Sequence, residues 1–301
     1  MDLREKFNNR VIPVNKEKGI TTFDSIRKFK KVVGLRKIGH AGSLDPIATG
    51  LVLILTGAAT KLSGYLMDLP KVYISDIRLG EATDTQDASG EVIERGEWEG
   101  ISEEDILSVL PEFTGRRMQM PPMYSALKHG GKPLYKLARK GREVEREPRE
   151  VNTESIELIS ADLPMCRIRV KCSRGLYLRT LSEEIGEKLG APSHMTGLTR
   201  VSIGHFDIER AISSGSFQDL KKGVDPGVEP AEALRHLSAI RMTTSQSSGL
   251  LDGKAPGVPS GSEFSTGELV RFLRPDGVLG GIGEIGPGRI TAIRRVLNYD
   301  S

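Results

Sequence analysis

The sequence predicts an α+β protein with a mostly antiparallel central sheet and a small β-rich module at its C-terminal end. Helix and strand patterns follow one another irregularly, without the repeating strand–helix–strand order of parallel sheets. After residue 240 the chain is rich in glycine and in short strand patterns. With 301 residues it is long enough for one large domain and one small one. We therefore expect a large domain over residues 1–238 and the module over residues 239–301.

Composition narrows the class of protein. Hydrophobic residues make up 38% and charged residues 28% of the chain, which is typical of a globular protein. No apolar run approaches the roughly 20 residues of a membrane-spanning helix, and residues 1–6 resemble no signal segment. A cytoplasmic protein is therefore expected. Cys166 and Cys172 lack the spacing of a zinc site, so we expect reduced core thiols and no metal.

The elements of the first part of the chain follow from periodicity and end signals. Residues 21–24 have the pattern of a capping box, and apolar residues then recur at helical spacing at positions 26, 29 and 33. The continuous apolar run from Leu51 to Leu55 predicts a buried strand. A helix is expected from Ala58 to Met67, and the alternation from Tyr73 to Leu79 predicts a strand.

The middle of the chain follows the same rules. A helix is expected at residues 103–109, and the strict alternation at residues 167–172 predicts a strand. A second capping box at residues 180–183 should begin another helix, which Gly190 ends.

The last third of the chain differs in composition from the rest. Residues 213–230 have the composition of a linker, and a short helix should follow at 231–237. Pro275-Asp276-Gly277 indicates a hairpin turn between two strands of the small module.

Basic residues are concentrated in two segments, although the net charge is only +3. Residues 27–37 hold six basic residues and no acid, and residues 128–149 hold eight against three glutamates. Either run alone is compatible with a solvated helix face. Two such runs, one of them rich in glycine, favour contact with nucleic-acid phosphates. We expect residues 119–149 to form an arm with a short helix near Leu134–Arg139.

The most informative segment lies between residues 39 and 50. It places His40 and the carboxylate of Asp45 in a glycine-containing loop directly before the buried strand. Pro46 biases Asp45 toward an extended backbone, so a stiff support presents the carboxylate. Taken alone, the Asp-Pro pair would indicate an Asx turn. A catalytic role for Asp45 depends on the longer pattern.

That longer pattern resembles the signature G-H-x-G-x-L-D-P-x-A-x-G of the TruB family of tRNA pseudouridine synthases, in its bacterial form. Other motifs of the family match in the same order along the chain. The resemblance covers residues 11–210 and is weak after residue 240. The matching segments are Lys71-Val72-Tyr73, Gln119 to Lys128, Gly175 to Thr180, and Leu198-Thr199-Arg200.

The resemblance implies the pseudouridine synthase fold, a PUA-like end module, and a reaction that needs no cofactor. It implies that Asp45 is the nucleophile, that Arg179 pairs with it, and that Tyr73 stacks on the target base. His40 would fill the gap left in the RNA loop when the uridine flips out. Leu198 would lie beneath the active site.

The remaining implied contacts are basic. Lys16 and Lys71 match family motifs and are expected to contact the substrate, although Glu17 replaces the proline that usually follows the first lysine. The implied substrate is the T stem-loop of tRNA, with isomerisation at position 55. A monomer without an obligatory protein partner is expected. In the arm, the residues expected to hold RNA phosphates are Lys128, Lys132, Lys136, Arg139 and Lys140.

Three other functions are compatible with parts of the pattern. A tRNA-folding chaperone would share the RNA surface but would need no turnover. A guide-RNA-dependent homologue would carry a different arm and, in some cases, a long basic tail. A nucleoside hydrolase would usually need an aspartate cluster with calcium, and no such cluster is evident in the sequence.

Overall fold

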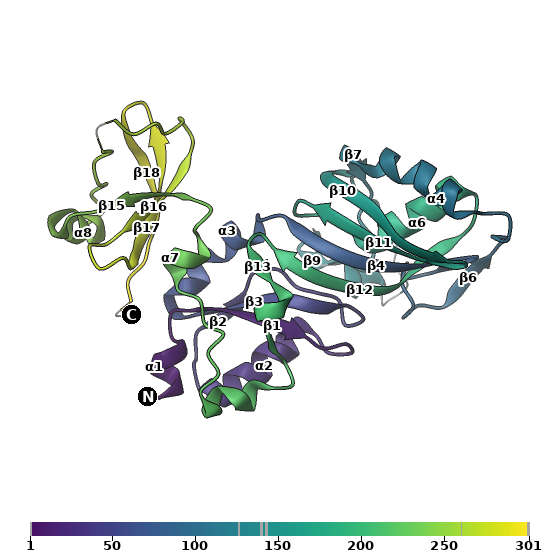
Figure 1. The fold of residues 1–301 in the computed structure, drawn as a ribbon, viewed down its shortest axis with the longest axis horizontal. Helices are drawn as coiled ribbons and strands as arrows, with labels where there is room; N and C mark the ends of the chain where they lie inside the picture. The colour runs from purple at the N-terminus through teal and green to yellow at the C-terminus, as the bar shows by residue number, and fades with distance from the viewer. Residues whose placement is uncertain (1, 126, 139–140, 142–143, 260, 300–301) are drawn as a thin grey trace.

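The computed structural model describes residues 2–125, 127–138, 141, 144–259 and 261–299 (Figure 1). A long mixed sheet forms the body of the protein, and a smaller sheet at the C-terminal end stands beside it. Within the described ranges, no helix is long and apolar enough to cross a membrane.

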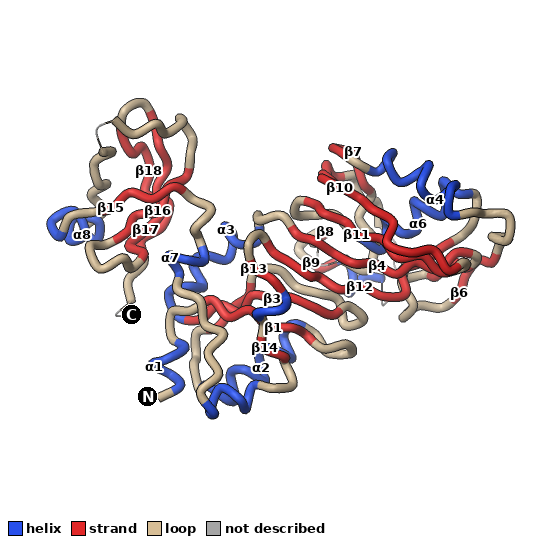
Figure 2. The backbone as a smooth tube through the Cα atoms, in the orientation of Figure 1, coloured by secondary structure: helices blue, strands red, loops and turns tan. Residues whose placement is uncertain are grey.

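The central sheet is mostly antiparallel, as predicted. Its described strand pairings are antiparallel apart from β1 with β14 and β3 with β12. Figure 2 shows the strands in red. β13 (Phe206–Asp207) pairs with β12, and β2 (Ile38–His40) pairs with β3. The order of the remaining strands across the sheet is β14 (Ile212–Ser213), β1 (Val11–Lys16), β3 (Thr49–Thr56), β12 (Ser193–Ile203), β4 (Lys71–Leu79), β11 (Met165–Cys172), β10 (Arg149–Asp162) and β7 (Gly115–Gln119).

The run Leu51–Leu55 within β3 is apolar at every position instead of alternating because both faces of the strand are covered. Leu51, Leu53 and Leu55 face one hydrophobic cluster, whereas Ile54 packs in another on the opposite face of the sheet. A strand covered on both faces has no polar side. The predicted buried strand is therefore confirmed, and it provides a rigid support for the loop that precedes it.

The helices cover the two faces of the sheet at different places. Helix α2 begins with the predicted capping box at Thr21 and Asp24, and it buries Phe29 and Val33. Helices α4 (Glu103–Val109) and α6 (Leu178–Leu189) lie over β4 and β11 and share their apolar cluster. The α-helices are α1 (Leu3–Phe7), α2 (Thr22–Val33), α3 (Ser63–Met67), α4 (Glu103–Val109), α5 (Leu134–Ala138), α6 (Leu178–Leu189), α7 (Pro230–Ala233) and α8 (Thr244–Leu251), and the 3-10 turns are η1 (Gly57–Leu62), η2 (Leu110–Phe113), η3 (Ile208–Arg210) and η4 (Phe217–Lys222).

Helix α6 begins earlier than its capping pattern suggested. The predicted cap at Thr180 lies inside the helix, because the first helical residue is Leu178 and Tyr177 is the N-cap. The Thr180 hydroxyl donates instead to the side-chain oxygen of Gln86, 3.0 Å away. A tertiary partner therefore replaces the local cap, and this shift moves Arg179 into the first turn of the helix.

The segment 213–230 is not an open linker, contrary to its composition. It contains the 3-10 turn η4, which buries Phe217 and Leu220. The Phe217 ring lies edge-on to Phe29 of helix α2, with 5.4 Å between the ring centroids. Two apolar side chains are enough to anchor a segment that is otherwise polar. The expected helix at 231–237 is shorter, since α7 ends at Ala233.

The C-terminal module is a four-stranded sheet with its own small core (Figure 1). The turn at residues 275–277 joins two antiparallel strands, as predicted. The module also shares a larger cluster with the main body, in which Leu279 and Leu297 pack with Leu62 and Leu66. Its strands are β15 (Ser238–Arg241), β16 (Leu269–Leu273), β17 (Leu279–Gly286) and β18 (Arg289–Val296).

Two short hairpins extend from the large domain. The first joins β5 (Glu81–Thr83) to β6 (Val92–Arg95). The second joins β8 (Lys128–His129) to β9 (Lys132–Pro133) and leads into α5 within the expected arm. Cys166 and Cys172 are buried free thiols, as expected.

Candidate active site

The loop that carries Asp45 is fixed to its neighbours by backbone hydrogen bonds. The Leu44 amide donates to the Thr22 hydroxyl at 3.0 Å, and the Gly19 amide donates to the Pro46 carbonyl at 2.8 Å. The Asp45 side chain keeps 46% of its surface exposed. A stiff loop therefore presents a solvent-accessible carboxylate, in agreement with the prediction from Pro46.

The expected partner of Asp45 lies beside it. Arg179, in the first turn of α6, places Nε 3.1 Å from a carboxylate oxygen of Asp45. Its side chain is buried, and its two terminal nitrogens donate to the carbonyls of Thr85 (3.2 Å) and Tyr124 (2.7 Å). The guanidinium is held from several sides, so it can fix the orientation of the carboxylate and balance its charge.

A second carboxylate shares this guanidinium. Asp87 lies 3.7 Å from Arg179 Nε and is itself buried. It accepts hydrogen bonds from the Thr85 hydroxyl and the Ser89 amide, both at 2.9 Å. Sequence reasoning did not single out Asp87. Its burial distinguishes it from neighbouring acids, and burial cannot be read from the local sequence.

Tyr73 and Leu198 come from the adjacent strands β4 and β12 and line a cavity of about 200 Å³. Asp45 and Arg179 stand at the same cavity. Burial raises the pKa of Tyr73, and the nearby Arg200 guanidinium offsets part of this rise. The cavity therefore combines an aromatic ring, an aliphatic side chain and a carboxylate, which suits a flat, mostly uncharged ring.

Arg200 is a residue of the site that sequence reasoning missed. It is almost fully buried, and its Nε donates to the Leu51 carbonyl at 2.6 Å. One terminal nitrogen donates to the Gly42 carbonyl at 3.2 Å, and the other lies 3.5 Å from the Tyr73 hydroxyl. Arg200 thus joins the loop before Asp45 to the aromatic wall of the cavity. The motif Leu198-Thr199-Arg200 contained the signal, but only Leu198 was given a role.

The loop also approaches β12 closely at its far end. Gly50 has a φ of +103°, and a Cβ at this position would lie 2.3 Å from the backbone carbonyl oxygen of Arg200. Any side chain would therefore collide with the neighbouring strand. This contact explains the glycine that closes the Asp45 segment.

A larger cavity of about 750 Å³ adjoins the first. Asp45 and Arg179 line both cavities, and Thr21, Asp84 and Asp87 contribute to the larger one. The ion pair therefore stands at the boundary between the small cavity that holds Tyr73 and a wider one lined by several carboxylates. This arrangement has room for a ring in one compartment and for the polar groups attached to it in the other.

Lys16 and Lys71 lie in the interior. Lys16 Nζ donates to the Ile20 carbonyl at 2.7 Å, and Lys71 Nζ donates to the Leu69 carbonyl at 2.6 Å. Burial lowers the pKa of each ammonium group to about 8. Both side chains are buried in this structure, and substrate contact by Lys16 and Lys71 stays a prediction. Their position supports neighbouring turns, including the one beside Pro46, where Lys16 Nζ is 3.5 Å from the carbonyl.

His40 ends strand β2 and is partly buried near the site. Its ring meets the ring of Phe23 edge-on, with centroids 5.4 Å apart. Burial lowers the pKa of His40, and the Arg200 guanidinium adds to this effect. A neutral imidazole is therefore favoured at neutral pH, which suits a stacking role better than a cationic one.

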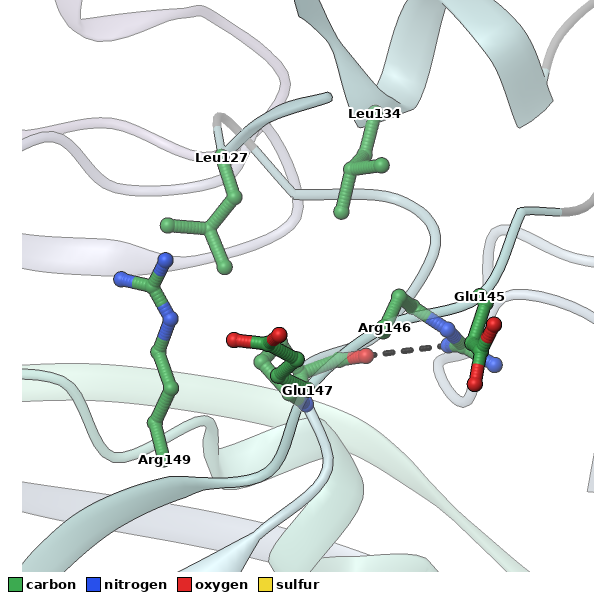
Figure 3. Close-up of a pocket in the computed structure, with 7 residues that line it drawn as sticks. Leu127, Leu134, Glu145, Arg146, Glu147 and Arg149 are labelled. Atoms are coloured by element: carbon green, nitrogen blue, oxygen red, sulfur yellow. Dashed lines mark hydrogen bonds between the residues drawn. The ribbon is translucent and has the colours of Figure 1, made fainter. Parts of the chain in front are cut away.

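The basic residues of the arm are described only in part. The backbone of Lys128, Lys132 and Lys136 belongs to the hairpin and to helix α5, whereas Arg139 and Lys140 lie outside the described residues. A separate cavity of about 350 Å³ lies at the base of the arm (Figure 3). In it, Arg146 donates to the Pro121 carbonyl at 2.9 Å. This cavity shares no lining residue with the two around Asp45.

Among the described residues, no group of three or more His, Cys, Asp or Glu side chains is arranged to hold a metal ion. The side chains that the site presents are a carboxylate, a fixed guanidinium and a phenol.

The chain is similar to known proteins in both its sequence and its fold. A tRNA pseudouridine synthase B from Geobacter sulfurreducens is 40% identical over 276 residues, covering 89% of this chain and 90% of the relative. Another from Francisella philomiragia is 43% identical and covers 70% of each chain. A chain in the crystal structure of a Cbf5-Nop10-Gar1 complex superposes with a TM-score of 0.77 at 22% identity, covering 100% of this chain and 88% of that one, which shows the shared fold. Residues 30–178 match the N-terminal domain of the TruB family pseudouridylate synthases, and the chain belongs to this family.

Proposed function

We propose that this protein isomerises uridine to pseudouridine in tRNA, at position 55 of the T loop, without a cofactor. The observation that carries the proposal is the Asp45 carboxylate, held by the buried Arg179 at the mouth of a cavity lined by Tyr73 and Leu198. The names of the relatives, tRNA pseudouridine synthase B, support tRNA as the substrate. The enzyme acts as a cytoplasmic monomer in this proposal.

The isomerisation is balanced without any oxidant or reductant. The N1–C1′ bond of uridine breaks, a C5–C1′ bond forms, C5 loses its proton and N1 gains one. Such a reaction needs a nucleophile that bonds transiently to the nucleoside while the base turns. Asp45 is accessible and oriented by Arg179, so it can attack and later leave. The ring of Tyr73 lies in the same cavity and can stack on the base, and its oxygen can receive the C5 proton as a phenolate, the form that the neighbouring Arg200 guanidinium stabilises.

The uridine must leave the folded RNA loop before it can react. Extruding a base from a stack costs a few kcal/mol. The small cavity can accept the extruded ring, while the adjoining cavity of about 750 Å³ has room for the attached sugar. In this proposal His40, at the end of β2, fills the space that the extruded base leaves.

The decisive experiment uses an unmodified tRNA transcript and the same tRNA in which the T-loop uridine is replaced by cytidine. After incubation with the protein, pseudouridine is mapped by chemical labelling and primer extension. We expect one modified site, at position 55, and none in the replaced transcript. A protein that binds the tRNA without turnover would be a folding chaperone, and dependence on an added guide RNA would indicate the guided class of synthase.

Removal of the C-terminal module should separate affinity from chemistry. A chain ending at Ser238 retains Asp45, Tyr73 and Arg179, so it should still convert a T-arm stem-loop. It should bind full-length tRNA more weakly, but only modestly, because rim contacts in a wet interface contribute little each. Binding and single-turnover rates with both RNAs measure the two effects.

The fold of the truncated chain must be checked, because Leu62 and Leu66 lose their apolar contacts with the C-terminal module. A variant with both leucines changed to polar residues on the truncated chain controls for aggregation. Folded truncated protein, as judged by circular dichroism, that is inactive on the stem-loop would place part of the active site in the module and contradict the boundary at 238.

The arm should contribute to the salt dependence of tRNA binding. Neutralising Lys132, Lys136, Arg139 and Lys140 together should reduce the slope of log affinity against log salt by up to about 0.9 for each phosphate that the arm no longer neutralises. A matched control neutralises Lys171 and Lys188, which already pair with Glu154 and Glu112 at 2.6 Å. An arm variant whose slope equals that of wild type would mean that the arm is a solvated face.

A further inference from the structure

Phe23 is an exposed aromatic residue that the core does not use. It lies in the first turn of helix α2 and keeps 64% of its surface accessible, whereas Phe29 and Val33 of the same helix are buried. Among the large hydrophobic side chains that are exposed in the described part of the chain, it is the one aromatic residue. A single exposed side chain is common, so its surroundings decide whether it has a role.

The ring of Phe23 has one defined neighbour, His40. The two rings lie 5.4 Å apart and are almost perpendicular, with an interplanar angle of 88°. In an edge-to-face pair, at least one face of each ring is not covered by the other. The large exposed fraction of Phe23 then leaves a flat aromatic surface open to solvent, next to a partly buried imidazole.

The position of Phe23 is fixed from both sides. Thr21 caps the helix through the amide of Asp24, and the Thr22 hydroxyl accepts the amide of Leu44, one residue before Asp45. Thr21 also lines the larger cavity together with Asp45. The exposed ring therefore belongs to the same rigid unit as the nucleophile and stands near the rim of its cavity.

The charges along helix α2 indicate the chemistry of a partner. The exposed side chains that follow Phe23 on this helix are basic, namely Arg27, Lys28, Lys30 and Lys31. An apolar protein surface would find no continuous hydrophobic patch here. A nucleic acid offers both a flat base for the ring and phosphates for the lysines.

We propose that Phe23, supported by His40, forms a stacking platform for an unpaired base of the RNA loop that flanks the extruded uridine. This inference rests on the proposed function and deepens it, because it adds a contact outside the cavity that holds the target ring. The platform holds the loop in its opened form, so it acts on RNA binding and leaves the chemical step to Asp45 and Tyr73.

The test uses a T-arm stem-loop RNA in which each unpaired loop purine is replaced in turn by 2-aminopurine. Phe23→Tyr keeps an aromatic face, whereas Phe23→Leu keeps apolar volume without one. We expect Phe23→Leu and Phe23→Ala to weaken binding by about 5- to 150-fold, the range measured for the loss of one stacked base. Phe23→Tyr should bind like wild type. At one loop position, quenching of 2-aminopurine fluorescence should persist with Tyr and disappear with Leu.

The kinetic pattern distinguishes stacking from a general structural effect. For Phe23→Leu, the single-turnover rate at saturating RNA should stay within about twofold of wild type, with the loss confined to the RNA concentration needed for half-saturation. Leu107→Ala, which removes an exposed apolar side chain from helix α4, is the matched control and should change neither quantity. Circular dichroism and thermal unfolding check the fold of each variant.

Two outcomes overturn the inference: Phe23→Ala binding as tightly as wild type, or Phe23→Tyr losing as much affinity as Phe23→Leu. Failure of the proposed function gives a different result, because then the wild-type protein itself forms no pseudouridine in the stem-loop. Active wild-type enzyme with Phe23-independent binding contradicts the platform alone.

Discussion

Asp45→Asn is expected to lower pseudouridine formation by at least about a thousand-fold, in line with the loss of a covalent nucleophile in other enzymes. The amide keeps the size and shape of the carboxylate, so the loop bonds of Leu44 and Pro46 remain. It loses the negative charge that faces Arg179 and the ability to attack. Binding of a T-arm stem-loop should remain within a few-fold of wild type, measured by fluorescence anisotropy.

The matched control for this variant is Asp84→Asn. Asp84 lines the same larger cavity but is exposed, and in the described structure its side chain accepts the Glu91 amide rather than a bond from Arg179. It should retain most of the activity. Turnover of Asp45→Asn at close to the wild-type rate would remove Asp45 from the role of nucleophile.

Tyr73→Phe is expected to stop or strongly slow product formation while RNA binding is retained. The phenylalanine ring keeps the aromatic wall of the cavity, but it lacks the hydroxyl that lies 3.5 Å from Arg200. Tyr73→Ala should in addition weaken binding by about 1–3 kcal/mol, the contribution of a stacked base. Single-turnover rates at saturating RNA and equilibrium binding separate these two losses.

Tyr65→Phe serves as the control for loss of a phenol. Tyr65 packs against a different apolar cluster, away from the cavity, and burial likewise raises its pKa. This variant should be active. If both Tyr73 variants turn over normally, the residue is part of the packing between β4 and β12 and has no role in proton removal.

The sequence was most informative where a signal is local. The caps and periodicity of helix α2, the apolar run of β3 and the alternation of β11 each depend on neighbours a few residues away, and the structure agrees with them. The motifs also brought Asp45 and Arg179 together correctly, although they lie far apart in the chain. A motif match carries such tertiary information that periodicity alone lacks.

The features that the sequence did not predict depend on the direction in which a side chain points. A motif shows that a lysine is present but not whether it faces solvent, and Lys16 and Lys71 face backbone carbonyls inside the protein. The role of Arg200 likewise became evident only from its burial and its bonds to Gly42 and Leu51. At Thr180, a partner from a distant hairpin replaced the local capping bond. At Arg200 and Thr180 a long-range contact overrode the local signal, whereas Lys16 and Lys71 bond to carbonyls close in sequence and are set apart by their burial.

The close approach of Gly50 to Arg200 has a consequence for the order of assembly. The Asp45 loop looks like a local signature, yet its last residue must be glycine because strand β12, 150 residues later in the chain, passes so close to it. The hydroxyls of Thr49 and Thr199 form a hydrogen bond at the same place. Contacts between such distant segments form slowly because a long loop must close first. On the ribosome, the Asp45 loop therefore cannot make this contact until residue 200 has emerged, and because β12 lies between β3 and β4, the two halves of the sheet stay unjoined until then.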